Sequence, residues 1–494
     1  MKMEFKQLDS DAFRAVGKAA DSLGLQCYAV GGYVRDLFLD RPSKDIDFVC
    51  VGQGSGIAVA KEVARNMLRN AKVSIFRTYG TAQVKFHNLE LEFVGARKES
   101  YRRDSRNPIV EEGTLDDDIS RRDFTINAMA IAVNADNYGT LIDRFGGRED
   151  LDARLIRTPL DPDITFSDDP LRMMRAIRFA TQLNFDIYGP TLDAITRNAD
   201  RISIITRERI STELMKIMQS QRPSIGWRLL AETGLLRHIL PQLDAMRGVE
   251  VVKGRGHKDN FGHTMLVLDR VAAQSDNVWL RWSALLHDIA KPVTKRWDNE
   301  VGWTFHNHNF VGGKMVPAIF KNLKMPLGEP MRYVRKMVEL HMRPIALVED
   351  VVTDSAIRRL IVDAGEDLDD LMLLCRADIT SRNPEKVRRH LANFDAVVAK
   401  MDDVNARDNL RLFQPPVSGE EIMTIFALPP SRPVGQIKDA IKDAIIEGII
   451  PNKREDALAY MLEVAAGLGL TPTDPNLVLS LNAKECSTSK NDSK

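Results

Sequence analysis

The stretch Cys27–Cys50, CYAVGGYVRDLFLDRPSKDIDFVC, decides the fold of the first part of this 494-residue chain. Its pattern predicts a strand, a glycine turn, a short helix, a loop and a second strand. Gly31 and Gly32 have no side chains, so backbone N–H groups in the turn can approach a phosphate closely. Asp45 and Asp47 stand two residues apart on the second strand, so both side chains leave the same face. Two carboxylates that converge in this way can hold Mg²⁺, or a pair of ions, for phosphoryl transfer.

Each feature of this stretch has a plain structural alternative. An isolated Asp-x-Asp pair on a strand is more often a solvated edge, and a double glycine is more often an ordinary turn. Here the two features stand one strand apart, and Arg35 follows the glycine turn, where an arginine suits a triphosphate. We therefore interpret the stretch as a nucleotide-binding site.

The motifs GGYVRD and DIDF resemble the head-domain signature of the class II CCA-adding tRNA nucleotidyltransferases and the bacterial poly(A) polymerases, within the polymerase-β-like superfamily. The resemblance implies that Asp45 and Asp47 bind the catalytic Mg²⁺ and that a neighbouring strand supplies a third carboxylate. Glu92, in LELEFVGAR, stands in the matching place, although a glutamate that faces water on an edge strand fits the same pattern.

The segment Ser120–Met129, SRRDFTINAM, contains the family element RRDFTINAM residue for residue. Planar guanidinium groups beside a carboxylate suit phosphate and ribose recognition, and an asparagine can both donate to and accept from a sugar hydroxyl. A salt-bridged helix start is the structural alternative. The predicted nucleotide-binding residues here are Arg121, Arg122, Asp123 and Asn127.

Two further segments of the first half are basic or glycine-rich. Arg97–Arg106, RKESYRRDSR, is interpreted as a loop that engages the triphosphate or the primer, although most charge runs are solvated faces. Asp143–Leu151, DRFGGREDL, resembles the family's hinge between head and neck, and a plain turn would have the same sequence.

The segment Ser167–Ala180, SDDPLRMMRAIRFA, predicts a helix with Asp169 as its N-cap. Arginines then recur every three residues along one helical face, which fits an RNA-facing side as well as a nucleotide site. The resemblance to the family element EDxxR implies that Asp169 and Arg172 make Watson–Crick-like hydrogen bonds to the incoming base. Asp168 stands where the family pattern has Glu, which weakens a role for that position only. The predicted nucleotide-binding residues of this helix are Asp169, Arg172, Arg175 and Arg178.

The segment RERISTEL resembles the family's last neck element, RxxxE. Arg209 and Glu213 stand four residues apart within it, so we expect a salt bridge that braces the neck helix.

Six of the nine histidines fall between His257 and His341. A histidine, an adjacent His-Asp pair and a distal aspartate form a plausible cage for a hard metal ion. The pattern resembles the HD phosphohydrolase domain of one branch of the CCA-adding family. By that resemblance His263, His287, Asp288 and Asp378 hold one metal, and His308 and His341 supply a second metal site or bind phosphate. A degenerate HD fold that only supports tRNA is the alternative.

Composition narrows the class of protein. Lys+Arg and Asp+Glu both number 69, which excludes a histone-like polycation but not a locally basic RNA-binding surface. Four cysteines without a CxxC pair fit a reducing compartment, and no window reaches the roughly 18 apolar residues of a membrane span. We expect a soluble cytoplasmic protein without a membrane partner.

The predicted fold class is α+β. A polymerase-β-like nucleotidyltransferase head, with a mixed sheet and helices, precedes an all-α neck, an HD-type helical body and a helical tail. The predicted bounds are a head at 1–150, a neck at 151–247, an HD domain at 248–383, a helical tail with expected tRNA contact at 384–483 and a disordered end at 484–494.

The leading functional prediction is template-independent addition of CCA to the 3′ end of tRNA from CTP and ATP, with release of pyrophosphate. A bacterial poly(A) polymerase has nearly the same head motifs, but Thr471–Lys494 lacks the strongly basic extension expected for a non-specific grip on RNA. An HD phosphohydrolase with an inactive head is the alternative of another class, against which the complete head motifs count. The expected cofactors are Mg²⁺ in the head and a second divalent metal in the HD domain.

Overall fold

The structure is a computed structural model, and it describes residues 3, 5–67, 71–100, 109–256, 259–349, 353–381, 383–408 and 416–474. The chain divides into two compact units. Met1–Arg281 and Pro317–Gly328 form the first, and Trp282–Val316 and Glu329–Lys494 form the second. Each unit is described by itself.

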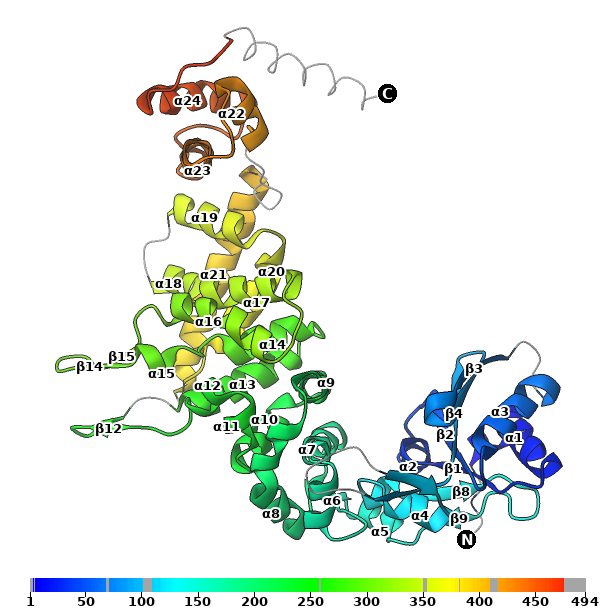
Figure 1. Ribbon diagram of the computed structural model, residues 1–494. Coiled ribbons are helices and arrows are strands. Elements are labelled where there is room, and N and C mark those ends of the chain that lie inside the picture. Colours follow the sequence, from blue (N-terminus) through cyan, green and yellow to red (C-terminus); the bar gives the residue numbers. More distant parts are fainter. Residues whose placement is uncertain are drawn as a thin grey trace. The chain divides into compact units, whose positions relative to one another are not determined.

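The first unit begins with a seven-stranded sheet in the order β3-β4-β5-β2-β1-β8-β9 (Figure 1). β2 and β5 pair in parallel and the other neighbours pair antiparallel, which confirms the predicted mixed sheet. The strands are β1 (Cys27–Val30), β2 (Asp45–Cys50), β3 (Lys72–Phe76), β4 (Thr81–Phe86), β5 (Leu89–Gly95), β8 (Ala130–Ala132) and β9 (Leu141–Ile142).

One face of this sheet forms the core of the head. Helices α1 (Asp11–Ser22) and α3 (Ser55–Glu62) pack on it, and α2 (Gly32–Phe38) follows β1. Phe48 of β2 is fully buried, and its ring lies 5.2 Å from that of Phe93 and 5.4 Å from that of Phe13. Because side chains alternate along a strand, burial of Ile46 and Phe48 directs the residues between them to the opposite face.

The neck is a set of short helices that continues the first unit. Helices α4 (Leu115–Ser120) and α5 (Gly147–Asp152) still belong to the head. The neck contains α6 (Pro162–Asp168), α7 (Leu171–Leu183), α8 (Gly189–Asn198), α9 (Arg207–Met218), α10 (Pro223–Glu232), α11 (Leu235–Ile239) and α12 (Pro241–Asp244). Helix α7 contacts both α9 and α10, and α10 contacts α13 (Asn260–Ala272).

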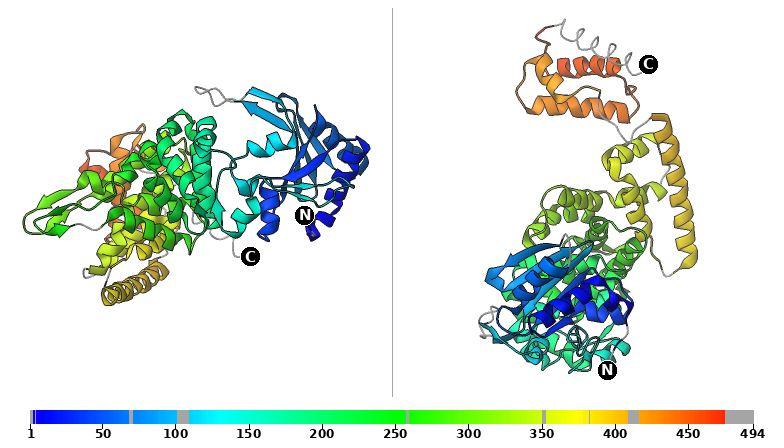
Figure 2. Two further views of the ribbon diagram at one scale, coloured as in Figure 1. Left: turned by 90° about the horizontal axis from the view of Figure 1, so that it is seen from below. Right: turned by 90° about the vertical axis from the view of Figure 1, so that its right-hand side faces the viewer.

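The following region is mostly helical. It contains α14 (Val278–Leu286), α15 (Lys291–Thr294), α16 (His308–Asn322), α17 (Glu329–Leu340), α18 (Met342–Glu349), α19 (Asp354–Ala364), α20 (Leu368–Asp378) and α21 (Pro384–Asp408). Figure 2 shows α21 as one long helix. Helices α22 (Gly419–Phe426), α23 (Arg432–Ile446) and α24 (Arg454–Gly467) then share a small apolar core of their own.

The predicted helical character of the chain after the head is confirmed, with short strand pairs as the exception among the described residues. Three two-stranded pairs interrupt the helices: β10 (Leu155–Ile156) with β11 (Asp186–Ile187), β12 (Val251–Val252) with β13 (Arg255–Gly256), and β14 (Arg296–Asp298) with β15 (Gly302–Thr304). Trp297 and Trp303 face each other across the last pair at 5.2 Å, and such aromatic cross-strand contacts stabilise a hairpin.

Two sequence predictions fall partly or wholly on residues that the structure does not describe. Arg97 and Lys98 begin strand β6 (Arg97–Ser100), which pairs with β7 (Ile109–Glu112), so the predicted basic loop starts as a strand. Its other arginines, Arg102, Arg103 and Arg106, lie outside the described residues, as does the predicted disordered end at 484–494.

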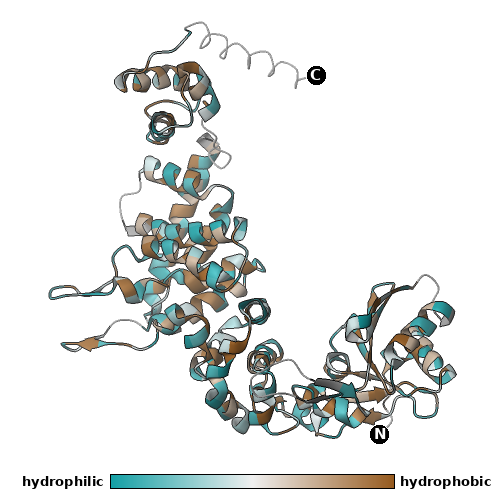
Figure 3. Ribbon diagram, viewed as in Figure 1, coloured by the Kyte–Doolittle hydropathy of each residue, from teal (hydrophilic) through white to brown (hydrophobic). Residues whose placement is uncertain are grey.

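Figure 3 shows hydrophobic and hydrophilic residues side by side along the helices. Among the residues that the structure describes, no helix combines the length and the apolar character needed to cross a bilayer.

Candidate active site and metal centre

The acidic residues predicted on β2 and β5 lie on the face of the head sheet opposite its core. Asp47 stands directly across from Glu92 in the parallel register, and Asp45 lies two residues along on the same face. Burial raises the pKa of Asp47, Arg122 opposes that shift, and the carboxylates of Asp45 and Asp118 add to it. Burial and the charge of Asp47 raise the pKa of Glu92. Carboxylates that repel one another in this way, with hard oxygen donors, fit a divalent cation such as Mg²⁺.

The glycine turn between β1 and α2 meets this acidic face. Gly31 has a φ of +75°, and a Cβ added there would lie 2.9 Å from Nη1 of Arg122 and 3.4 Å from Oδ2 of Asp47. Gly32 begins α2. The close approach leaves no room for a side chain, so the turn, the arginine and the carboxylate meet at one point.

Asp118, a residue that the sequence reasoning missed, holds the two arginines of the RRDFT element. Its side chain on α4 is fully buried, and its carboxylate accepts hydrogen bonds from Nη2 of Arg121 at 2.6 Å and Nη2 of Arg122 at 3.1 Å. The i, i+3 and i, i+4 spacing of these residues is the signal that could have found the contact. Asp118 thereby fixes Arg122 beside Gly31.

Asp123 is the centre of a buried network that joins the RRDFT element to α2 and α7. Its Oδ2 accepts from Nη2 and Nε of Arg175 at 2.6 and 2.7 Å, and its Oδ1 accepts from the Phe124 N–H and the Asn127 amide. Asn127 in turn accepts from Nη1 of Arg35 at 2.9 Å. Although burial alone would raise the pKa of Asp123, Arg175 and Asn127 hold it at about 2. Direct contact of these residues with a nucleotide stays a prediction.

Asp169 and Arg172 lie at the start of α7. Oδ1 of Asp169 accepts the N–H of Leu171 at 3.1 Å, which is the predicted capping bond, although Pro170 takes the N-cap position. Nη2 of Arg172 donates to the carbonyl of Arg121 at 2.6 Å. The first turn of α7 therefore contacts the backbone of the RRDFT element.

The predicted salt bridge between Arg209 and Glu213 is not the pairing in the structure. Glu213 accepts from Nε of Arg178 at 2.5 Å, and both side chains are buried. Arg209 pairs with Asp169 instead, at 3.5 Å. Contacts between helices replace the contact within one helix because Arg178 and Glu213 face each other across the buried interface of α7 and α9.

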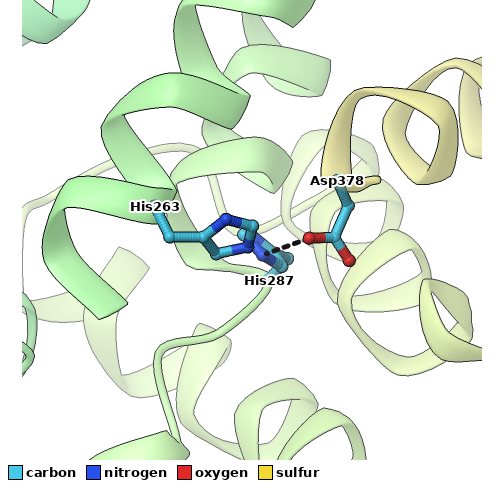
Figure 4. A group of neighbouring side chains, drawn as sticks. All are labelled: His263, His287 and Asp378. Atoms are coloured by element: carbon cyan, nitrogen blue, oxygen red, sulfur yellow. Dashed lines mark ion pairs between the residues drawn. The ribbon is translucent and has the colours of Figure 1, made fainter. Parts of the chain in front are cut away.

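The predicted His-Asp cluster comes together from separate helices. His263 on α13, His287 after α14 and Asp378 at the end of α20 place one ligand atom each within 4.8 Å of one another (Figure 4). Nε2 of His287 lies 3.7 Å from Oδ1 of Asp378. Asp288 belongs to a second such group, which it forms with His308 and His341.

Three imidazoles of the cluster are oriented in the same way. Nδ1 of His287, His308 and His341 each lies within 2.8 Å of a carbonyl three residues earlier in the chain. A carbonyl only accepts, so each Nδ1 carries a proton, and in the neutral ring Nε2 then keeps its lone pair for a metal. Nε2 of His308 lies 3.3 Å from Oδ1 of Asp288 and that of His341 lies 4.0 Å from it, and neither makes a hydrogen bond with a described residue. A backbone-anchored Nδ1 with an inward Nε2 is the usual arrangement of a metal-ligating histidine.

The charges around Asp288 keep it ionised. Although burial alone would raise the pKa of Asp288, His287 and Lys291 hold it well below its ordinary range, and Nζ of Lys291 lies 2.6 Å from Oδ2. Burial and the neighbouring His287 lower the pKa of His341 to about 4. Although burial alone would lower the pKa of His287, the charges of Asp288 and Asp378 raise it. A buried carboxylate among imidazoles is a donor set that fits a divalent transition metal.

Family models match three consecutive parts of the chain. A poly A polymerase head domain matches residues 27–157, a probable RNA and SrmB-binding site of polymerase A matches 184–247, and an HD domain matches 260–383.

Individual relatives agree with these matches. The A-adding tRNA nucleotidyltransferase of Deinococcus radiodurans is 31% identical over 69% of this chain and 77% of its own length. The multifunctional CCA protein of Pseudomonas aeruginosa is 31% identical over 68% of this chain and 81% of its own length. The A-adding tRNA nucleotidyltransferase of Aquifex aeolicus is 43% identical over 40% of this chain, but the match spans only 24% of that longer protein.

Solved structures have the same fold. A tRNA nucleotidyltransferase complexed with a primer tRNA and an incoming ATP analog is 26% identical, with a TM-score of 0.54 over 78% of this chain and 99% of that chain. A CCA-adding enzyme in its apo form I has a TM-score of 0.61 at 21% identity, over 94% of this chain and 95% of that chain. The chain therefore belongs to the tRNA nucleotidyltransferase and poly(A) polymerase family, in the branch with an HD domain behind the head and neck.

Proposed function

We propose that the chain adds cytidine, cytidine and adenosine to the 3′ end of tRNA, using CTP and ATP and releasing pyrophosphate. The observation that supports this most strongly is the register that sets Asp47 across from Glu92, on the sheet face that meets the glycine turn. Asp45, Asp47 and Glu92 would hold Mg²⁺, which when bound neutralises charge on the transferred phosphoryl group and lowers the pKa of the attacking hydroxyl.

The residues around the acidic face would bind and orient the triphosphate. Arg122, anchored by Asp118, lies where it would contact phosphate oxygens above the turn at Gly31. The network of Asp123, Asn127 and Arg175 would keep the RRDFT element against α7, so that sugar and base meet a fixed surface. In-line attack by the primer 3′-hydroxyl on the α-phosphate then forms the new ester and expels pyrophosphate.

An extension assay with a tRNA transcript that lacks its 3′ end tests the proposal. With CTP and ATP, a product three nucleotides longer, followed by arrest, is expected. An ATP-only ladder would instead identify a poly(A) polymerase. No extension together with phosphatase activity would identify an HD phosphohydrolase whose head is inactive.

A narrower second candidate is addition of the terminal adenosine only. Two of the relatives described above are A-adding enzymes, and one of them is 43% identical to this chain over 201 residues. A transcript that ends in CC separates the candidates: an A-adding enzyme extends it with ATP but does not extend a transcript that lacks both cytidines.

Asp169 and Arg172 are proposed to read the incoming base, since a carboxylate and a guanidinium together match the donor and acceptor edges of cytosine and adenine. Arg172→Ala is expected to reduce the discrimination of CTP and ATP from the other nucleotides about tenfold, because a good bidentate contact supplies about 1–3 kcal/mol of discrimination. The measurement is kcat/KM for each nucleotide beside the Kd for tRNA, with Arg228→Ala, at an exposed arginine of α10, as control. Unchanged selectivity would show that Arg172 does not read the base.

The His-Asp cluster is proposed to bind one or two divalent metals and to hydrolyse a phosphoester such as a 2′,3′-cyclic phosphate. Mn²⁺ at about one hundred times its Kd is expected to stabilise the folded chain by about 2.7 kcal/mol, and Asp378→Asn is expected to remove most of that effect. Thermal unfolding with and without Mn²⁺, and after chelation, measures it. A chain that gains no stability from Mn²⁺, Co²⁺, Ni²⁺ or Zn²⁺ would have an HD fold with a purely architectural role.

A further inference from the structure

A pocket in the neck, apart from both candidate sites, has a volume of about 320 Å³. Its walls come from the start of α9, from α11 and α12, and from the end of α16, all within the first unit. This volume is at the low end of the range of sites that hold a small organic ligand. The Ser211 hydroxyl donates to the carbonyl of Leu323, which fastens α9 to the end of α16 and so holds the pocket open between fixed walls.

The polar groups of the pocket are available to a ligand. Nη1 of Arg207 donates to the carbonyl of His238 at 3.0 Å. This bond orients the guanidinium and leaves its remaining N–H donors available to a ligand. Gln242 and Asn322 also line the pocket, and their side-chain amides make no hydrogen bond to any described residue. The described lining contains no carboxylate. Arg207, Gln242 and Asn322 therefore line the same pocket with unused side-chain donors.

The charge of the rim favours an anion. Lys321 and Lys324 flank the lining residue Asn322 in sequence and are exposed. Two nearby carboxylates are already paired: Asp200 with Arg237 at 3.2 Å and with His238 at 2.9 Å, and Asp244 with Arg247 at 3.1 Å. Glu208, which follows Arg207 in the chain, is exposed. The lining itself therefore contributes the charge of Arg207 and no carboxylate, which suits a phosphate.

The remaining wall is apolar. Leu240, Ile319 and Leu323 are buried side chains that line the same space. A phosphate next to an apolar wall and two amides, each able to donate and accept, is the set of contacts that a nucleotide requires. Arg207, His238 and Gln242 also fall within the segment that matches the model of a probable RNA-binding site.

We propose that this pocket, the neck pocket, binds one nucleotide of the RNA on which the enzyme acts, with its phosphate on Arg207 and its base between the apolar wall and the amides of Gln242 and Asn322. The proposal rests on the proposed function, because the RNA is the tRNA substrate. The neck pocket would grip RNA at a second point, away from the 3′ end that reacts, and would fix the register of the substrate in the neck.

The test compares the Kd for tRNA of the full chain with that of its variants at several salt concentrations. Arg207→Gln is expected to weaken binding about fivefold to tenfold and to reduce the slope of log K against log salt by about one, because one phosphate contact is lost. The double variant Gln242→Leu/Asn322→Leu keeps the bond from Arg207 to His238, and it is expected to weaken binding about fivefold with an unchanged salt slope. Arg228→Gln, which removes an equal charge from an exposed position of α10, is the control and should change the Kd less than twofold.

The outcomes separate this inference from the proposed function. A wild-type chain that extends tRNA while both neck-pocket variants keep its Kd and salt slope would overturn the inference alone. A wild-type chain that neither binds nor extends tRNA would overturn the proposed function and the inference with it. Titration with AMP and with inorganic phosphate distinguishes the source of the phosphate: binding of AMP that Arg207→Gln abolishes, with no effect on tRNA, would make the neck pocket a free-nucleotide site and overturn the RNA assignment.

Discussion

Asp47→Asn is expected to lower the rate of nucleotide addition about 10³-fold, with the Kd for tRNA unchanged. The substitution keeps the size of the side chain but removes a charged oxygen ligand from the face where Asp45 and Glu92 also lie. Fewer carboxylates would hold Mg²⁺, and charge that develops on the transferred phosphoryl group would lose its main stabilisation. Single-turnover extension of a tRNA transcript that ends in CC, at saturating ATP, measures the loss.

A neighbouring carboxylate provides the matched control for Asp47. Glu90 lies on the same strand as Glu92, but its charge is met by Nζ of Lys85 at 2.6 Å and by the amide of Gln83 at 2.9 Å. Glu90→Gln is expected to change the rate less than about threefold, because a surface pair of this kind contributes little. Stabilisation by Mn²⁺ at the His-Asp cluster should survive in both variants. Equal losses for Asp47→Asn and Glu90→Gln would contradict a specific metal site at Asp47.

The local features of the head were predictable from the sequence because they depend on neighbouring residues. Alternation along β2 predicted that Asp45 and Asp47 share a face, and the structure places them there because Ile46 and Phe48 are buried on the other. The cap of α7 by Asp169 was predictable for the same reason. The position of Glu92 depends on the register of β5 against β2, which is set by packing between strands that lie far apart in the chain.

The features that the sequence did not predict are contacts between elements. Arg209 and Glu213 were predicted to pair because they stand four residues apart on one helix. In the folded neck, Glu213 instead pairs with Arg178 on another helix, at a buried position. The spacing of Asp118 to Arg121 and Arg122 permits its two ion pairs, but the neighbouring aspartates of α4 have similar spacings, and the burial that selects Asp118 comes from the tertiary fold. The neck pocket forms from α9, α11, α12 and α16, and no local pattern brings those segments together.

Glu213→Ala is expected to weaken the packing of α7 on α9 by about 3–5 kcal/mol, the usual cost of breaking a buried ion pair. The change leaves Arg178 buried between the two helices with the amide oxygen of Gln182 at 3.0 Å and the ring of Phe179 at 4.0 Å as its remaining contacts. Burial already lowers the pKa of Arg178, and Glu213 is the main group that opposes this shift. Hydrogen exchange of the α7 and α9 amides reports the local loss directly, which suits a chain of two units better than one global unfolding curve.

Two comparisons decide whether the weaker packing of Glu213→Ala comes from the unpaired charge of Arg178. The double variant Arg178→Met/Glu213→Leu removes both charges. It should recover most of the protection of the α7 and α9 amides from hydrogen exchange, since replacing a buried ion pair with apolar side chains often leaves stability unchanged. Arg148→Ala breaks an exposed i, i+4 pair with Asp152 and should cost less than about 1 kcal/mol. If the double variant were as weakened as Glu213→Ala, the shape of the side chains rather than their charge would hold α7 against α9. Because Arg172 and Arg175 lie on the same helix as Arg178, the proposed base-reading surface would then depend on packing volume and not on this ion pair.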